Sequence, residues 1–191
     1  MKNKRGDNRF FRNKKGKTSY LFENKKGSGI FGMGFGMIFS IILIVFFIVV
    51  AFIAIKAFLD TQKCAQIGLF VMDLQEEIDK TWNSQKSDFE FKSRLPTKIK
   101  YVCFADLSKD ITAVGTVGNI GRELGVYKGH IANFFLYPSE SACNMVFHEI
   151  NHIDIDKIIS ENKNPYCIPV DSGVIKMPIN KDFNEKLVNI G

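Results

Sequence analysis

The sequence lacks several motifs on which common enzyme classes depend. It contains no P-loop, no GxSxG motif and no CxxC pair. It therefore gives no support for a phosphate-binding loop of the P-loop type, an α/β-hydrolase nucleophile or a zinc ribbon. It also has only one Trp and three His among its 191 residues. With 46% hydrophobic residues, however, it is too apolar to be disordered throughout.

Charge is absent from one long stretch. No charged residue occurs in the 28 residues from Ser28 to Ile55. About 20 apolar residues suffice to cross a bilayer as a helix, and a soluble helix has no need of apolar residues on every face. The stretch is longer than the roughly 7–15 apolar residues of a cleaved signal peptide, and no convincing small-x-small cleavage site follows it. We expect residues 28–58 to form a transmembrane helix that acts as a signal anchor.

The basic charge is confined to the N-terminus. Residues 1–26 hold ten Lys or Arg and two acidic residues, whereas residues 59–191 hold 15 basic and 18 acidic residues. The mildly acidic C-terminal part argues against a nucleic-acid partner. Because basic flanks stay cytoplasmic, the N-terminus is predicted to lie inside the cell and residues 59–191 outside. Residues 1–27 are predicted to form a disordered cytoplasmic arm suited to anionic lipid headgroups.

A helical period continues beyond the apolar stretch. Apolar residues recur on one helix face at Ile67, Val71, Leu74, Ile78 and Trp82. No proline interrupts residues 30–82. The pattern predicts one long helix that ends near Asn83, with residues 59–84 as an amphipathic extension.

The remaining residues, 85–191, show short alternating patterns typical of strands. The candidates are residues 89–92, 98–104, 112–117, 131–137, 153–155, 166–170, 173–177 and 186–190. The glycine-rich segment 115–121 is interpreted as a hairpin turn. We therefore predict an α+β fold. Its long N-terminal helix, transmembrane and then amphipathic, packs on a mostly antiparallel outer sheet of about six short strands.

All four cysteines follow the apolar stretch. They are Cys64, Cys103, Cys143 and Cys167. The predicted outer side is an environment where disulfides persist, and four cysteines allow three pairings. We predict Cys64–Cys103, which would tie the helix to the sheet, and Cys143–Cys167, which would close the segment between them. Each disulfide is expected to contribute roughly 2–4 kcal/mol of stability.

One short motif carries possible chemistry. His148-Glu149-Ile150-Asn151-His152 matches HExxH, in which two histidines on one helix face bind Zn²⁺ and the glutamate acts as general base. The residues after it alternate like a strand, and no third ligand is evident. Histidines four residues apart on a strand lie about 13 Å from each other, too far to share a metal. We therefore predict no metal site and no catalytic residue, and keep zinc at His148 and His152 with Glu149 as base as the alternative.

Several segments resemble a family of membrane proteins. The segments are CAQIGLFVMDLQEEIDKTWNS (64–84), FEFKSRLPTKIKYVCFAD (89–106), NFFLYPSESACN (133–144) and NPYCIPV (164–170). They resemble uncharacterised single-pass membrane proteins of small-genome archaea, which have a basic tail, a membrane helix and a cysteine-containing outer domain. The resemblance implies location and architecture but no activity.

The architecture is also similar to that of type IV pilins, in which a long N-terminal helix is half apolar and half packed on a domain. Lys26-Gly27-Ser28 is compatible with a pilin leader cleavage site. Such pilins carry Glu at the fifth mature position, and Gly32 stands there in this chain. The resemblance therefore implies pilin-like architecture without implying polymerisation.

Together these observations predict a non-catalytic, membrane-anchored extracytoplasmic domain, which could serve as a pilin-like structural or interaction subunit of the cell surface. The expected partners are the lipid bilayer and other membrane or cell-surface proteins, with no nucleic acid and no cofactor. The alternative is a membrane-anchored zinc metalloprotease that uses residues 148–152.

Overall fold

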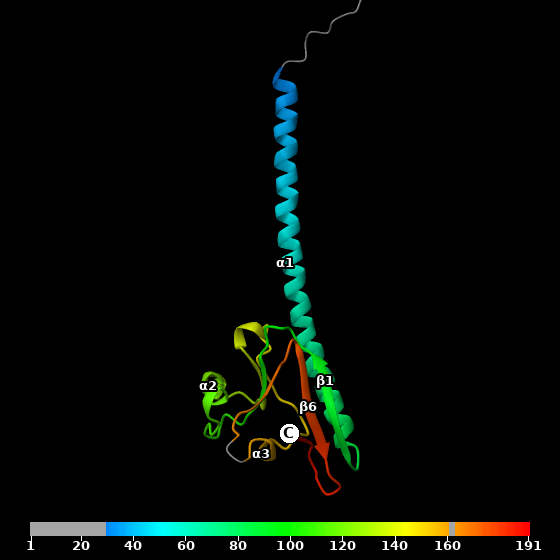
Figure 1. Cartoon of the computed structure of the whole chain (residues 1–191), viewed down its shortest axis with the longest axis vertical. Coiled ribbons are helices and arrows are strands. Elements are labelled where there is room, and N and C mark those ends of the chain that lie inside the picture. The colour runs from blue at the N-terminus through cyan, green and yellow to red at the C-terminus, as the bar shows by residue number, and fades with distance from the viewer. Residues whose placement is uncertain (1–29, 161–162) are drawn as a thin grey trace, which may run out of the picture. The chain divides into compact units, whose positions relative to one another are not determined.

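The computed structural model describes residues 30–160 and 163–191 of the chain. The predicted arm over residues 1–27 lies outside the described residues. By compactness the chain divides into two units, Met1–Val50 and Ala51–Gly191. The described part of the first unit is entirely helical, whereas every strand belongs to the second unit (Figure 1).

A single helix, α1 (Ile30–Trp82), contains 53 residues and includes both the apolar stretch and its extension. The prediction of one long helix that ends just before Asn83 is confirmed. Its most apolar 18-residue window contains no buried residue. By length and composition α1 can therefore cross a membrane.

Within the described residues, seven strands form two antiparallel sheets. The first sheet has the order β1 (Ser87–Arg94), β6 (Val174–Lys181) and β7 (Asn189–Ile190). The second has the order β4 (Phe147–His148), β3 (Phe134–Tyr137), β2 (Tyr101–Phe104) and β5 (Tyr166–Pro169). The predicted α+β class is confirmed, with the strands divided between two sheets instead of one.

The main hydrophobic core is built on one face of α1. Ile67, Phe70, Leu74 and Ile78 are at most 1% exposed. They share a core with residues from both sheets, and β1 and β6 lie alongside the C-terminal part of α1 (Figure 1). The predicted helix face is therefore confirmed at its centre, although Trp82 at its end remains 38% exposed.

The C-terminus of α1 is capped by a buried lysine. Lys181 is only 8% exposed. Its side chain donates hydrogen bonds to the carbonyl oxygens of Trp82 and Ser84, both at 2.7 Å. A cation at this position satisfies carbonyls left unpaired at the helix end and complements the helix dipole. Trp82 Nε1 in turn donates to the Lys186 carbonyl at 3.1 Å.

A second, smaller core lies on the other face of the four-stranded sheet, under α2 (Gly115–Leu124). This helix contradicts the predicted strand at 112–117 and the predicted hairpin at 115–121. Gly121 serves close packing instead of a turn, because a Cβ there would lie 2.6 Å from Pro165 Cδ.

The strand predicted over residues 153–155 is also absent. Ile153 makes only an isolated bridge to Val188, and the chain then enters a short helix, α3 (Ile155–Ile158). The Asp154 carboxylate accepts a hydrogen bond from the Lys157 backbone N–H at 3.0 Å and so caps that helix. Two 3₁₀ turns, η1 (Gly125–Tyr127) and η2 (Ser139–Ser141), complete the described helices.

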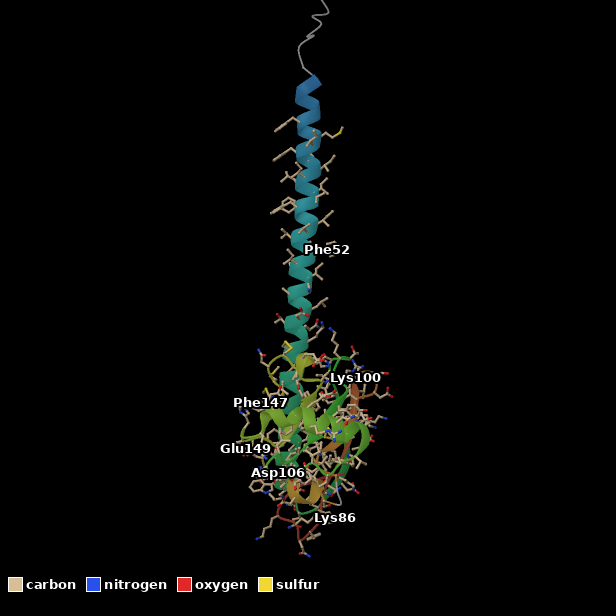
Figure 2. The ribbon with its side chains drawn as sticks, turned by 90° about the vertical axis from the view of Figure 1, so that its left-hand side faces the viewer. Phe52, Lys86, Lys100, Asp106, Phe147 and Glu149 are labelled. Carbon is tan, nitrogen blue, oxygen red and sulfur yellow. A yellow bond between two sulfur atoms is a disulfide. The ribbon has the colours of Figure 1, made fainter. Side chains whose placement is uncertain are left out.

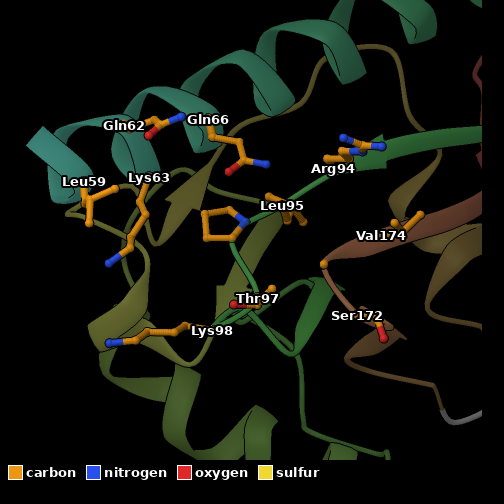
Figure 3. Close-up of a pocket in the computed structure, with 12 residues that line it drawn as sticks. Leu59, Gln62, Lys63, Gln66, Arg94, Leu95, Thr97, Lys98, Ser172 and Val174 are labelled. Carbon is orange, nitrogen blue, oxygen red and sulfur yellow. The ribbon is translucent and has the colours of Figure 1, made fainter.

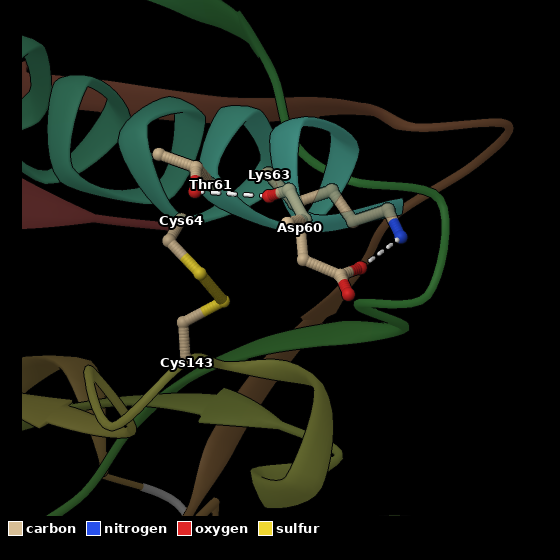
Figure 4. The surroundings of a disulfide bond; sticks show 6 residues. Asp60, Thr61, Lys63, Cys64 and Cys143 are labelled. Atoms are coloured by element: carbon tan, nitrogen blue, oxygen red, sulfur yellow. Dashed lines mark hydrogen bonds and ion pairs between the residues drawn. A yellow bond between two sulfur atoms is a disulfide. The ribbon is translucent and has the colours of Figure 1, made fainter. Parts of the chain in front are cut away.

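The predicted disulfide pairing is wrong. The structure joins Cys64 to Cys143 (Figure 4), which ties α1 to the segment before β4. It joins Cys103 to Cys167. The reason is the alternation of β2. Val102 and Phe104 point into the main core with α1, whereas Cys103 points to the opposite face, into the core under α2. Cys103 therefore cannot reach α1, and it lies directly opposite Cys167 in the β2–β5 register.

This pairing predicts the outcome of peptide mapping. Digestion of the full chain without reduction should yield one linked peptide pair containing Cys64 and Cys143 and a second containing Cys103 and Cys167. A Cys103→Ser, Cys167→Ser double variant should keep the first link, because the two bonds lie in different cores. Recovery of a Cys64–Cys103 link by mass spectrometry would contradict the register of β2.

Candidate functional site

The HExxH segment does not form a helix. His148 ends β4, and residues 151 and 152 form a turn in which His152 has a φ of 65°. Two histidines share a face at a spacing of four residues only in a helix. The local backbone therefore removes the feature that gives the motif its zinc-binding geometry.

His148 lies beside the main core. It pairs with Phe134 in the β3–β4 register, and their rings are 6.1 Å apart. Its Nε2 is buried and has no hydrogen-bond partner among the described residues. Burial lowers the pKa of His148, while a hydrogen bond with the Met145 backbone acts in the opposite direction. The environment thus favours a neutral imidazole.

His152 is occupied by contacts with α1. Its ring stacks on Trp82 with centroids 3.8 Å apart and planes inclined by 5°. Its Nδ1 lies 2.9 Å from Asp79 Oδ1. The neighbouring Asn151 N–H donates to Gln75 Oε1 at 2.9 Å, and Gln75 Nε2 donates to Asp79 Oδ1 at 2.8 Å. These contacts fasten the turn to the last two turns of α1, which is a structural role.

Glu149 lies apart from both histidine environments. It is exposed at the rim of a recess of about 170 Å³ that Asp106 and Asn133 also line, and Figure 2 shows Glu149 and Asp106 near each other. The part of the chain that the structure describes contains no group of three His, Cys, Asp or Glu side chains arranged to hold a metal. The three motif residues therefore lie in different local environments and do not form one site.

A larger recess lies elsewhere, beside α1. We call it the α1 cleft. It has a volume of about 540 Å³ and is lined by Leu59, Gln62, Lys63 and Gln66 of α1, by residues 94–98 and by residues 172–174 (Figure 3). The α1 cleft thus has three walls, which come from α1, from the end of β1 with the loop after it, and from the turn before β6.

The base of the α1 cleft is held by backbone contacts. The Leu95 N–H donates to the Gly173 carbonyl at 2.9 Å, and the 171–174 turn is closed by reciprocal bonds between Asp171 and Val174. Gly173 has a φ of +78°, and a Cβ there would lie 3.0 Å from the Leu95 carbonyl oxygen. A glycine is therefore required for the close approach of these two segments.

The polar groups of the α1 cleft are cations and neutral side chains. Lys63, Arg94 and Lys98 line it, whereas no acidic residue does. Lys63 and Lys98 reach toward the same end of the α1 cleft from two different segments, and Arg94 lies toward the other end (Figure 3). The arrangement suits an anion better than a cation or a neutral ligand.

Sequence analysis missed this cleft. Its charge count treated residues 59–191 as one mildly acidic unit, and an average conceals a local excess of one sign. The available signal was the segment 94–100, RLPTKIK, in which three cations flank a proline turn. Only the fold shows that part of this segment faces Lys63 of α1.

Comparisons with known proteins add no homologue: no protein-family model, curated protein or solved structure matches the chain.

The geometry of residues 148–152 predicts that the motif does not hold zinc. The purified full chain should contain far less than one zinc per molecule, and His148→Ala should leave the metal content unchanged. Elemental analysis by mass spectrometry after dialysis against a weak chelator measures both. Stoichiometric zinc that disappears in His148→Ala would show that the segment adopts a metal-bound conformation different from this one.

Proposed function

We propose that the protein is a non-catalytic, membrane-anchored extracytoplasmic domain. The observation that carries the proposal is the continuity of α1. Its apolar part exposes all the side chains of its most apolar window, as a helix in lipid does, and the same helix then supplies the centre of the domain core. The apolar stretch and the core face thus belong to one helix.

The disulfides support an extracytoplasmic location. All four cysteines are paired, and both bonds lie in the unit formed by residues 51–191. Disulfides persist in oxidising compartments and are rare in the cytosol. The basic residues before the apolar stretch support the same orientation, with the N-terminus inside.

The finer proposal is a pilin-like structural or interaction subunit of the cell surface. The architecture of α1 supports this proposal, and so does the side of the helix that faces away from the core. Leu69 and Met72 are 58% and 68% exposed there, one helical turn apart. Other membrane or cell-surface proteins are the proposed partners of this helix side.

Cysteine labelling tests the orientation. Lys128→Cys places a thiol on an exposed loop of the domain, and Ser19→Cys places one before the apolar stretch. A membrane-impermeant maleimide added to intact cells that express the full chain should label Lys128→Cys only. The native cysteines stay silent because they are paired.

Permeabilised cells provide the control, since both variants should then be labelled. Labelling of Ser19→Cys in intact cells with none of Lys128→Cys would reverse the orientation. A chain recovered entirely in the soluble fraction would refute the anchor itself.

A further inference from the structure

We propose that the α1 cleft binds the anionic, phosphate-bearing headgroup of a membrane lipid. The inference rests on the proposed membrane anchor and names a ligand for the domain. It follows from where the cleft lies along α1, from the charges that line it and from the neutral and apolar side chains beside them.

The position along α1 matches the headgroup region. The helix residues of the α1 cleft, Leu59 to Gln66, follow Ile55, the last residue of the charge-free stretch, by 4 to 11 positions. At ~1.5 Å per residue this corresponds to roughly 6–16 Å along the helix. The polar headgroup regions of a bilayer begin where the hydrocarbon ends. Lys100 lies at the end of the domain from which α1 emerges, and Lys86 lies at the opposite end (Figure 2).

The cations of the α1 cleft are only partly neutralised. Lys63 pairs with Asp60 at 3.0 Å (Figure 4). Among the described residues, Arg94 and Lys98 have no carboxylate within ion-pair distance, so the lining keeps excess positive charge. The pKa of Asp60 is lowered mainly by Lys63, with smaller effects of Lys56 and Lys98, which shows that several cations act at this end of α1.

Neutral donors and apolar groups complete the fit. Gln62 and Gln66 on the helix wall and Thr97 on the loop wall can hydrogen-bond phosphate or glycerol oxygens. Leu59 and Val174 offer apolar surface of the kind that the first carbons of a lipid require. A volume of about 540 Å³ falls within the range of small-ligand sites.

The position also favours a lipid over a free anion. A lipid in the bilayer is confined to the surface at which the α1 cleft opens, so its effective concentration is far above that of a dissolved anion. A soluble phosphate would have to bind the same cations without the apolar contacts. We therefore commit to the lipid and use free phosphate as the competing source.

The experiment compares two lipids of identical acyl chains on the full chain in detergent micelles. Phosphatidylglycerol and phosphatidylcholine are titrated, and bound lipid is counted by native mass spectrometry. We expect at least fivefold tighter binding of phosphatidylglycerol, because one cation near a membrane surface changes binding by roughly fivefold. An Arg94→Ala, Lys98→Ala double variant should reduce the preference at least fivefold relative to the unchanged chain.

Lys128→Ala is the matched control, since it removes an exposed cation away from the α1 cleft. It should retain the full preference. The basic residues 2–26 are unchanged in all variants, so any preference due to them appears in every sample. Non-reducing peptide mapping verifies that the double variant keeps both disulfides.

The outcomes separate the alternatives. The lipid site is supported if the double variant alone loses the preference. It also requires that the unchanged chain keeps the preference in 10 mM inorganic phosphate. Loss of the preference in 10 mM phosphate identifies a site for free anions and overturns the lipid assignment. Equal binding of both lipids, or an equal preference in the double variant, overturns the proposal while leaving the membrane anchor intact. The anchor itself would be refuted by recovery of the chain entirely in the soluble fraction.

Discussion

Burial of one face of α1 is the constraint on which the rest of the domain depends. Ile67, Phe70, Leu74 and Ile78 stand at the centre of the main core and contact residues of both sheets. Strands β1 and β6 form the longest sheet pairing and lie along this helix (Figure 1). Because each sheet must cover an apolar face, and α1 is the element that both share, the helix fixes where the two sheets meet. Lys181 and Trp82 then fasten its C-terminus.

The same constraint connects the anchor to the cleft. The apolar stretch and the helix face that forms the core both belong to α1. The residues of α1 that wall the α1 cleft follow the charge-free stretch by one to three helical turns in sequence. The Cys64–Cys143 bond adds a covalent tie on the same part of the helix. This is why the α1 cleft, walled by residues 59–66, can serve a ligand that is itself confined to the membrane surface.

Much of the helical architecture could be predicted from the sequence, because a period of four and three residues persists from Ile67 to Ile78 and no proline interrupts it. The predictions that failed concern features that depend on contacts between segments far apart in the sequence. Gly121 looked like a turn residue, yet its missing Cβ serves packing against Pro165. The pairing of Cys103 depends on which face of β2 meets α1, and a shift of one residue reverses that face. Of the candidate site, the HExxH segment is non-helical as predicted, but the alternation after it, on which that prediction rested, does not form a strand. The α1 cleft was not predicted, because Lys63 lies 31 and 35 residues before the other two cations, Arg94 and Lys98.

The central claim, that a face of the anchor helix is the core of the domain, is tested most directly by Phe70→Ala. Phe70 is 1% exposed, whereas Met72, two residues later, is 68% exposed and gives a matched control on the same helix. Trp82 is the single tryptophan of the chain and stacks on His152, so its fluorescence in a urea titration reports domain unfolding. The account predicts that Phe70→Ala lowers the free energy of unfolding by about 3–5 kcal/mol, and that Met72→Ala changes it by no more than about 0.5 kcal/mol. Equal and small effects of the two substitutions would contradict it.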